Sequence, residues 1–512
     1  MRNILLLPAL LFSFLPVLAG ELPDVHEVSI SDLQAGYERG DFSVADITRA
    51  YLARIEALDR DGPALNSVLA VNPQALDDAA RLDEELAAGR SRGPLHGVPV
   101  LLKDNVDTAG LATTAGSKIL EGSLPPADAF LVERLRQAGA VVLGKSNLSE
   151  WANFHSSFSS SGWSRLGGQT RNPYDTTRNP CGSSSGSAVA TAASLAAFTI
   201  GTETDGSIVC PAQANGIVGL KPTVGLVSRT GVIPISHSMD SPGPMTRTVT
   251  EAAIVLGALA GLDADDTATE KADAHRSEDY TQYLEADALE GRRIGLYTKP
   301  MGNHYRVDAV THAAVDALKA AGAEVVEIEQ IAEEDIGALA FEVLLHEFRA
   351  GLDAYFSSLG EEAPVADFDG LIAAIRDDPG ETARFDRSLM FMASQRGGLD
   401  SELYRNALLA MHQETRDNGI DRVMDEHELD ALIAPSGSPA WKTDLTLGDN
   451  LSISSSSPAA RAGYPIITVP MGFIDGLPVG LSFFGRAWSE PVLLSMAYAF
   501  EQATGHRQPP EL

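Results

Sequence analysis

The chain has few cysteines, few lysines and a shortage of positive charge. Only two of its 512 residues are cysteine, Cys181 and Cys210, and eight are lysine. The 38 basic residues are outnumbered by 70 acidic ones, so the formal net charge is −32. A charge of this sign excludes a general nucleic-acid-binding surface and attraction to anionic membranes. No spacing of cysteine and histidine is typical of a metal site, and we expect neither a metal nor another cofactor.

Long apolar runs are also missing, with one exception at the N-terminus. Met1–Asn3 carry a positive charge, residues 4–18 are mostly apolar, and the small residues Ala19 and Gly20 follow. This pattern is typical of a secretory signal peptide, so we predict that residues 1–20 are removed from a secreted or periplasmic protein. No later run approaches the length of a membrane span, which argues against stable membrane association.

Export bears on the two cysteines. An oxidising compartment permits a disulfide between Cys181 and Cys210, and a pair of free buried thiols is the alternative. Both cysteines flank the segments that carry the candidate chemistry described below.

The order of apolar segments indicates an α/β protein with enough hydrophobic residues, 44%, for an extensive core. Capping boxes at residues 31–34 and 43–46 predict helices near the N-terminus. Residues 95–255 alternate between strands and helices. Residues 331–428 are helical and charged, and we expect them to cover the sheet and line substrate access. Further strands are expected at residues 431–434, 466–469 and 479–483.

The first segment with candidate chemistry is GVPVLLKDN, which contains Lys103. The apolar run Val98–Leu102 predicts a buried strand, and a lysine at its end loses hydration, which disfavours the charged form of the amine. A neutral lysine is a competent general base. The alternative is a lysine that extends to solvent or pairs with Asp104 or Asp107.

The second segment is the serine run CGSSSGS at residues 181–187. It precedes the alanine-rich stretch 188–193, which predicts a helix. The serine hydroxyls and backbone N–H groups therefore cluster near a helix N-terminus, where negative charge is favoured. A flexible linker is the alternative, but such linkers are rarely followed at once by an apolar helix.

The third segment is GTETDGS at residues 201–207, which follows the apolar residues 198–200. Backbone N–H groups around Asp205, Gly206 and Ser207 are expected to converge on one oxygen, as an oxyanion hole requires. A glycine turn between two strands is the alternative.

Together these segments resemble the amidase signature family, and within it the bacterial peptide amidases. The similarity covers nearly the whole mature chain, including PLHGVPVLLKDNVDTAGLATTAGS, RNPYDTTRNPCGSSSGSAVA, GTETDGSIVCPAQANGIVGLKPTVGLVS and GLPVGLSFFG. The resemblance implies one large α/β domain at residues 21–512, built on a twisted mixed β-sheet with helices on both sides. It also implies a hydrolase that acts on the C–N bonds of linear amides.

Residue by residue, the resemblance implies a Ser-Ser-Lys triad. Ser207 matches the nucleophile, Ser183 matches the serine that follows a cis peptide bond and relays protons, and Lys103 matches the base. Ser184 matches a residue that helps to hold the lysine. The family's oxyanion hole corresponds to the backbone N–H groups of Thr204, Asp205, Gly206 and Ser207.

Two other motifs compete with this interpretation. Gly139–Ser146 satisfies the phosphate-loop pattern, but its variable positions look like a strand and not like the loop that cradles a phosphate. Gly182–Gly186 satisfies the nucleophile-elbow pattern, but residues 172–180 before it are no strand. A Ser-His-Asp hydrolase with His155 or His237 as the base is therefore the second mechanism.

We expect an exported amidase that forms an acyl-enzyme and cleaves small-molecule or peptide amides, with C-terminal amides of peptides as the favoured class. Val209 stands where some relatives carry an arginine for anionic substrates, so no substrate carboxylate is expected to be anchored there. A general aliphatic or aryl acylamidase is the nearest alternative. A catalytically silent exported binding protein is the alternative from a different class. No oligomeric state is predicted.

Overall fold

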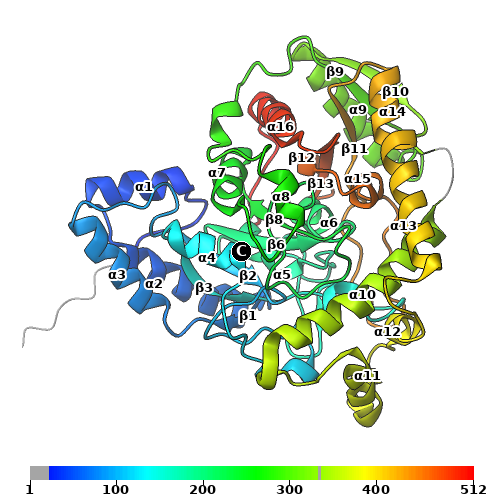
Figure 1. The fold of residues 1–512 in the computed structure, drawn as a ribbon. Coiled ribbons are helices and arrows are strands. Elements are labelled where there is room, and N and C mark those ends of the chain that lie inside the picture. Colours follow the sequence, from blue (N-terminus) through cyan, green and yellow to red (C-terminus); the bar gives the residue numbers. More distant parts are fainter. Residues whose placement is uncertain (1–21, 333–335) are drawn as a thin grey trace, which may run out of the picture.

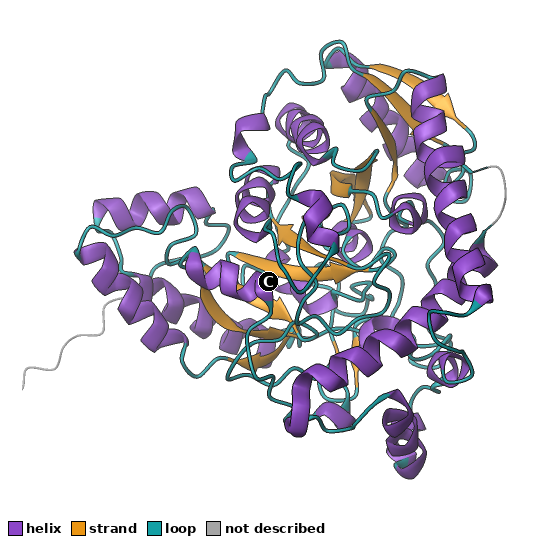
Figure 2. Ribbon diagram, viewed as in Figure 1, coloured by secondary structure: helices purple, strands orange, loops and turns teal. Residues whose placement is uncertain are grey.

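The fold is built on one mixed β-sheet, which confirms the predicted large single-domain α/β architecture. The computed structural model describes residues 22–332 and 336–512, so the predicted signal peptide lies outside the described residues. Eleven strands form the sheet (Figures 1 and 2) in the order β1 (Val68–Val71), β3 (Val141–Ser146), β2 (Pro99–Lys103), β6 (Phe198–Glu203), β8 (Ser241–Thr246), β7 (Val218–Lys221), β12 (Ile466–Ile474), β13 (Leu477–Phe484), β11 (Ala431–Pro435), β9 (Arg293–Tyr297) and β10 (Glu324–Ile328). A separate two-stranded sheet pairs β4 (Trp163–Ser164) with β5 (Gly168–Gln169).

The central strands have the properties that their sequences predict. β2 is buried at all five positions, as expected for the apolar run that ends at Lys103. It runs parallel to both β3 and β6, and Leu102 lies opposite Ile200. Because parallel strands end at the same edge of a sheet, the residues after β2 and after β6 lie together.

Helices cover the sheet on both sides. The alanine-rich helix α5 contacts β2 and β6 and is buried along its whole length, whereas α7 and α16 contact each other and the neighbouring strands. The helices of this central part are α4 (Phe130–Gln137), α5 (Ser185–Ala192), α6 (Val209–Ala214), α7 (Val249–Leu259), α8 (Ala268–Ala272), α9 (Tyr305–Ala320), α15 (Ser457–Ala462) and α16 (Glu490–Thr504).

The N-terminal helices form the predicted layer beside the β1 end of the sheet, at the left of Figure 1. They are α1 (Ile30–Arg39), α2 (Val44–Arg54) and α3 (Ala75–Ala87). The capping box of α2 at Ser43 and Asp46 is confirmed. The box predicted at residues 31–34 is wrong, because Ser29 and Asp32 cap α1 instead. This earlier start places Ile30 and Leu33 on the buried face of the helix.

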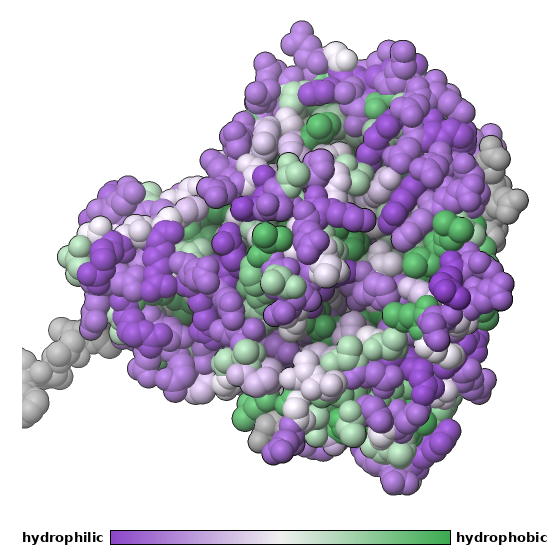
Figure 3. Space-filling model, in the orientation of Figure 1, coloured by the Kyte–Doolittle hydropathy of each residue, from purple (hydrophilic) through white to green (hydrophobic). Residues whose placement is uncertain are grey.

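The region predicted to be helical between residues 331 and 428 forms the right-hand side of Figure 1. Its helices are α10 (Gly337–Leu359), α11 (Phe368–Asp377), α12 (Ser388–Ala393), α13 (Glu402–Thr415) and α14 (Asp421–Glu426). Figure 3 shows a largely hydrophilic face with hydrophobic groups over α13, where Leu403 and Leu409 are exposed. Within the described ranges, no helix is both long and apolar enough to cross a membrane.

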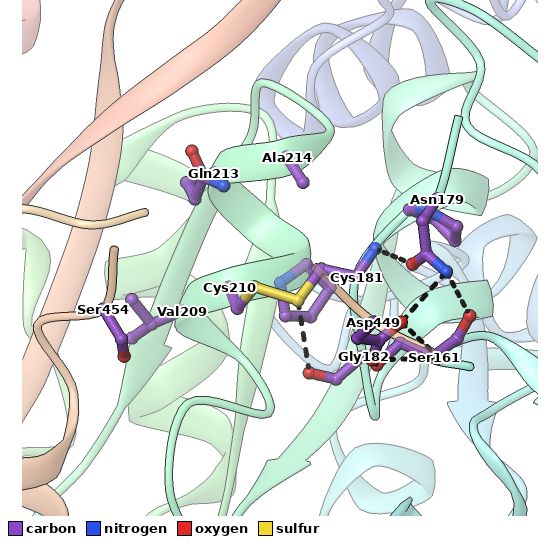
Figure 4. The surroundings of a disulfide bond; sticks show 12 residues. Ser161, Asn179, Cys181, Gly182, Val209, Cys210, Gln213, Ala214, Asp449 and Ser454 are labelled. Atoms are coloured by element: carbon purple, nitrogen blue, oxygen red, sulfur yellow. Dashed lines mark hydrogen bonds between the residues drawn. A yellow bond between two sulfur atoms is a disulfide. The ribbon is translucent and has the colours of Figure 1, made fainter. Parts of the chain in front are cut away.

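A disulfide joins Cys181 to Cys210, which decides between the two alternatives for these cysteines. Cys181 lies two residues before Ser183, and Cys210 lies on α6 three residues after Ser207. Figure 4 shows that the bond connects the segment before α5 with α6. The Cys181 N–H donates to Asn179 Oδ1 at 2.8 Å. The bond therefore fastens the two serine-bearing segments to each other.

The disulfide predicts a loss of stability when it is removed. The two cysteines are 29 residues apart, and closing a loop of this length lowers the entropy of the unfolded chain enough to contribute roughly 3 kcal/mol. We expect the double variant Cys181→Ser/Cys210→Ser to have a lower Tm and a lower denaturant midpoint than the wild type. Reductant should lower the wild-type Tm and leave the Tm of the double variant unchanged. Equal Tm values for the two proteins without reductant would contradict this prediction.

Candidate active site

Lys103 lies at the end of β2 with its side chain completely buried. Its Nζ atom is 2.8 Å from Ser183 Oγ, 2.8 Å from Thr202 Oγ1 and 3.1 Å from the Thr202 carbonyl oxygen. Burial lowers the pKa of Lys103 to about 7, and the carboxylates of Asp240 and Glu203 oppose part of this shift. The amine is therefore neutral in a large fraction of molecules at neutral pH.

Thr202 and Asn105 complete the surroundings of the lysine, and sequence reasoning missed both residues. Asn105 Nδ2 donates to Thr202 Oγ1 at 3.0 Å, so the threonine hydroxyl joins the asparagine to the amine. Both residues lie inside segments that the sequence singles out, GVPVLLKDN and GTETDGS. Their role depends on the pairing of β2 with β6, which the sequence pattern does not specify.

Ser183 is buried directly before α5 and follows a cis peptide bond after Gly182, as the resemblance implied. Its neighbour Ser184 does not contact the lysine. Ser184 Oγ donates to the Thr202 carbonyl oxygen at 3.0 Å and accepts from the Thr202 N–H at 3.1 Å. Ser184 thus supports Lys103 through Thr202, the residue that the two side chains share as a partner.

Ser207 stands in the turn between β6 and α6 and is 8% exposed. Gly206 before it has a φ of 85°, a conformation that favours glycine and turns the chain sharply at this point. The Ser207 carbonyl oxygen accepts a hydrogen bond from the Ser184 N–H at 3.1 Å. This bond holds the Ser207 turn against the segment that carries Ser183.

Side chains of the turn at residues 204–207 anchor it to the rest of the protein. Several of its backbone N–H groups remain available as donors. Thr204 Oγ1 donates to Asp240 Oδ1 at 2.5 Å, and the Asp205 carboxylate accepts from Ser456 Oγ at 2.6 Å and Ser457 Oγ at 2.8 Å. In residues 22–332 and 336–512, no acceptor is bonded to the N–H groups of Thr204, Asp205 or Ser207. These N–H groups can stabilise an oxyanion.

The buried carboxylate of Glu203 holds the start of α6. Its Oε2 atom accepts from the N–H groups of Ile208 at 2.7 Å and Val209 at 2.9 Å. Burial raises the pKa of Glu203, and the N–H groups of Val209, Ile208 and Gly206 oppose this shift. Glu203 thus fixes the first turn of α6, directly after Ser207.

A cavity of about 490 Å³ opens beside these groups. Ser183, Thr202 and Thr204 line its inner end, and α10 contributes Gly351, Ala354 and Tyr355 to its wall. The helical region thus supplies part of the space next to Ser183, as the sequence suggested. The Tyr355 hydroxyl donates to the buried carboxylate of Asp107 at 2.9 Å, which fixes this part of α10.

Glu347 attaches α10 to the opposite wall of the cavity. Its fully buried carboxylate accepts from Tyr404 O–H at 2.7 Å, from Ser238 O–H at 2.9 Å and from the Ser236 hydroxyl. The loop at residues 235–240, which carries both serines, also contains Asp240, the partner of Thr204. The position of α10 and the position of the Ser207 turn are therefore linked through one loop.

The two histidines of the alternative mechanism are placed for other roles. His155 is buried, its Nδ1 atom lies 2.7 Å from the Glu150 carbonyl oxygen, and burial lowers its pKa to about 3. His237 is half-exposed, with Nε2 3.3 Å from Glu347 Oε1. Within the part of the chain that the structure describes, neither ring is hydrogen-bonded to Ser183 or Ser207.

The phosphate-loop pattern at residues 139–146 has no phosphate cradle. Val141–Ser146 form β3, and Lys145 is completely buried, with its Nζ atom 2.6 Å from the Val106 carbonyl oxygen and 3.4 Å from Asp104 Oδ1. The contacts of this lysine are therefore structural. Among the described residues, no group of three histidine, cysteine, aspartate or glutamate side chains is placed to hold a metal ion.

Comparison with known proteins agrees with this geometry. The family described as Amidase matches residues 46–494. The structure of the native peptide amidase from Stenotrophomonas maltophilia is 50% identical in sequence and superposes with a TM-score of 0.91, covering 95% of this chain and 98% of that chain. A probable amidase of Arabidopsis thaliana is 39% identical, over 95% of this chain and 92% of its own length.

A further relative belongs to an enzyme of different specificity. This glutamyl-tRNA(Gln) amidotransferase component from Thermosynechococcus vestitus is 36% identical, over 94% of this chain and 99% of its own length. Because these relatives differ in the substrates that their names indicate, the similarity shows the family of this chain and not its substrate. The family match covers most of this chain and shows that the chain belongs to the amidase family, whose members hydrolyse amide C–N bonds, and that it is close to peptide amidase.

Proposed function

We propose that the protein is an exported amidase that uses Lys103, Ser183 and Ser207 as a catalytic triad and acts on C-terminal amides of peptides. The observation that carries the mechanism is the buried 2.8 Å contact between Lys103 Nζ and Ser183 Oγ. The hydrogen bond between Ser184 and Ser207 holds the second serine beside it. The substrate class is supported by 50% identity to a peptide amidase.

The hydrogen bonds of the lysine fit a base. A neutral amine has two N–H groups and one lone pair. The Thr202 carbonyl can only accept, and the Thr202 hydroxyl, which accepts from Asn105, has a second lone pair that accepts from the amine, so both lysine N–H groups are directed at Thr202. The lone pair is then left for the Ser183 hydroxyl proton.

The reaction follows from this direction of proton transfer. The Ser183 proton moves to Lys103 as the Ser207 proton moves to Ser183 and Ser207 Oγ attacks the amide carbonyl carbon. N–H groups of the turn at residues 204–207 stabilise the oxyanion. Ser183 then protonates the leaving nitrogen, the C–N bond breaks, and Lys103 returns its proton to Ser183. Water attacks the acyl-enzyme by the same route and releases the carboxylate.

Export is supported by the signal-peptide pattern and by the disulfide. Disulfides are rare in reducing cytosol and persist in secreted and periplasmic proteins. The name of the amidotransferase relative includes tRNA, which is a polyanion. This chain has a net charge of −32 and is therefore poorly suited to bind a polyanion. A general acylamidase is the second candidate function, since the family covers amides of several kinds.

Substitution of the nucleophile tests the mechanism. Because only Ser207 can form the ester, Ser207→Ala should lower kcat by a factor that approaches about 10⁶ and should abolish labelling by an amide-directed fluorophosphonate, measured by intact-protein mass. Lys103→Ala should be nearly as damaging. His155→Gln and His237→Gln, as controls, should retain most activity. A folded histidine variant as inactive as Ser207→Ala would refute the lysine mechanism.

The pH profile tests the charge state of the base. A base with a pKa of about 7 must be deprotonated to act, so kcat/KM should rise as the pH increases through about 7. Asn105→Asp places a carboxylate beside Thr202 and the amine, which favours the charged lysine and should move this rise to higher pH by about one unit. Asn105→Ser, the neutral control, should leave the midpoint in place. A downward shift for Asn105→Asp would contradict the assignment of the base.

A panel of substrates tests the proposed specificity. Purified mature protein should release ammonia from C-terminal amides of peptides and from N-blocked amino-acid amides, and product masses should show no cut at internal peptide bonds. Efficient turnover of small aliphatic or aryl amides, with none of peptide amides, would reject the peptide-amide assignment and favour the acylamidase.

A further inference from the structure

We infer that the cavity beside Ser183 selects acyl groups that are apolar along their length and cationic or neutral, but not anionic, at their outer end. This inference rests on the proposed function and names the substrates of the same site. It is carried by two independent features of the cavity, an apolar wall and an acidic rim whose arginine is paired with an aspartate.

The wall is formed by a loop and by one face of α10. Val232, Ile233 and Ile235 line the cavity and are themselves buried against the protein. Gly351 and Ala354 of α10 lie opposite. A Cβ atom added at Gly351 would meet the Pro234 side chain at 2.9 Å, so the helix and the loop already approach as closely as they can. The helix and the loop are therefore closely packed, and the apolar lining favours an aliphatic or aromatic acyl group.

Arg229 lines the cavity, and its positive charge is paired with the carboxylate of Asp266. Arg229 Nε donates to Asp266 Oδ2 at 2.8 Å, and a second nitrogen donates to Asp266 Oδ1. The third nitrogen donates to the His237 carbonyl oxygen. Each nitrogen of Arg229 thus has a protein acceptor. A substrate carboxylate would therefore compete with Asp266 for the charge of this arginine.

Two further carboxylates remain without a cation of their own. Asp240 lines the cavity and is bonded only to neutral donors, the Thr204 hydroxyl and the N–H groups of Ile235 and Ser236. Asp265 lines the rim and is exposed, and in the described part of the chain its carboxylate forms no hydrogen bond or ion pair. Among the described residues, the lining of the cavity therefore holds three aspartates and one arginine, together with His237, whose ring lies against the Glu347 carboxylate.

This arrangement of charges discriminates between acyl groups by the charge at their outer end. An ammonium or guanidinium group that reaches the rim meets Asp265 and is attracted, whereas a carboxylate is repelled and meets an arginine whose charge is already paired with Asp266. The net charge of −32 adds a long-range contribution of the same sign. Because Asp265 is exposed, salt should weaken the discrimination.

Matched substrates test the inference. N-acetyl amides of lysine, norleucine and glutamate present a cationic, a neutral and an anionic end on side chains of similar length. At low ionic strength, kcat/KM for ammonia release should be at least about tenfold higher for the lysine amide than for the glutamate amide, and 0.5 M NaCl should reduce this ratio severalfold. N-acetylalaninamide should be at least about tenfold poorer than the norleucine amide, because it leaves the apolar wall uncovered.

A pair of variants assigns the effect to the rim. Asp265→Asn should lower the lysine-to-glutamate ratio at least about threefold. Asp77→Asn removes the same charge from an exposed position on α3, in the N-terminal layer at the left of Figure 1, and should leave the ratio unchanged. Circular dichroism and Tm measurements establish that both variants are folded.

The outcomes separate this inference from the proposed function. Turnover of the norleucine amide with no preference for lysine over glutamate, or an equal response to the two variants, would overturn the inference and leave the amidase function intact. Failure to hydrolyse any of the four amides would overturn both.

Discussion

The site depends on the burial of one amine. Lys103 ends a strand that is enclosed on both sides, and the loss of hydration brings the pKa of its ammonium group down to about 7. A solvated lysine would remain charged at neutral pH and could not accept a proton from a serine. The same burial requires a partner for each N–H group and for the lone pair of the amine, and Thr202 and Ser183 lie within hydrogen-bond distance of it. The burial of the proposed base thus determines which kinds of residue surround it.

The sheet satisfies this requirement by bringing two strand ends together. β2 delivers the lysine, and the adjacent parallel strand β6 delivers Thr202 and then the turn that carries Ser207. The serine-bearing segment before α5 packs onto the same edge, where Ser184 bonds to both Thr202 and Ser207. The disulfide between Cys181 and Cys210 joins the two serine-bearing segments covalently. Residues far apart in the sequence are held within hydrogen-bond distance because they lie at one edge of one sheet.

Much of this arrangement could be predicted from the sequence. The apolar run before Lys103, the alanine-rich stretch after the serines and the turn at Gly206 each have a local pattern that specifies a strand, a helix or a turn. Thr202 and Asn105 could not be assigned to the lysine, because their contact depends on which strands pair and in what register. The first helix starts earlier than predicted because the sequence offers two capping boxes. Ser29 is followed three positions later by Asp32, and Ser31 is followed three positions later by Gln34. Burial of Ile30 and Leu33, a tertiary effect, selects Ser29.

The proposed triad comes from one stretch of the chain, whereas the cavity beside it is shaped by two. Lys103, Ser183 and Ser207 lie within residues 99–246, as do Val232 and Ile233 of the wall, but Gly351 and Ala354 belong to α10, which begins 130 residues after Ser207. Substitutions at Gly351 or Ala354 alter the space offered to a substrate, whereas a substitution at Glu347 of the same helix also reaches the Ser207 turn through the loop at residues 235–240. The fold thus allows substrate preference to evolve at some positions of α10, while Glu347 constrains how far the helix itself can move.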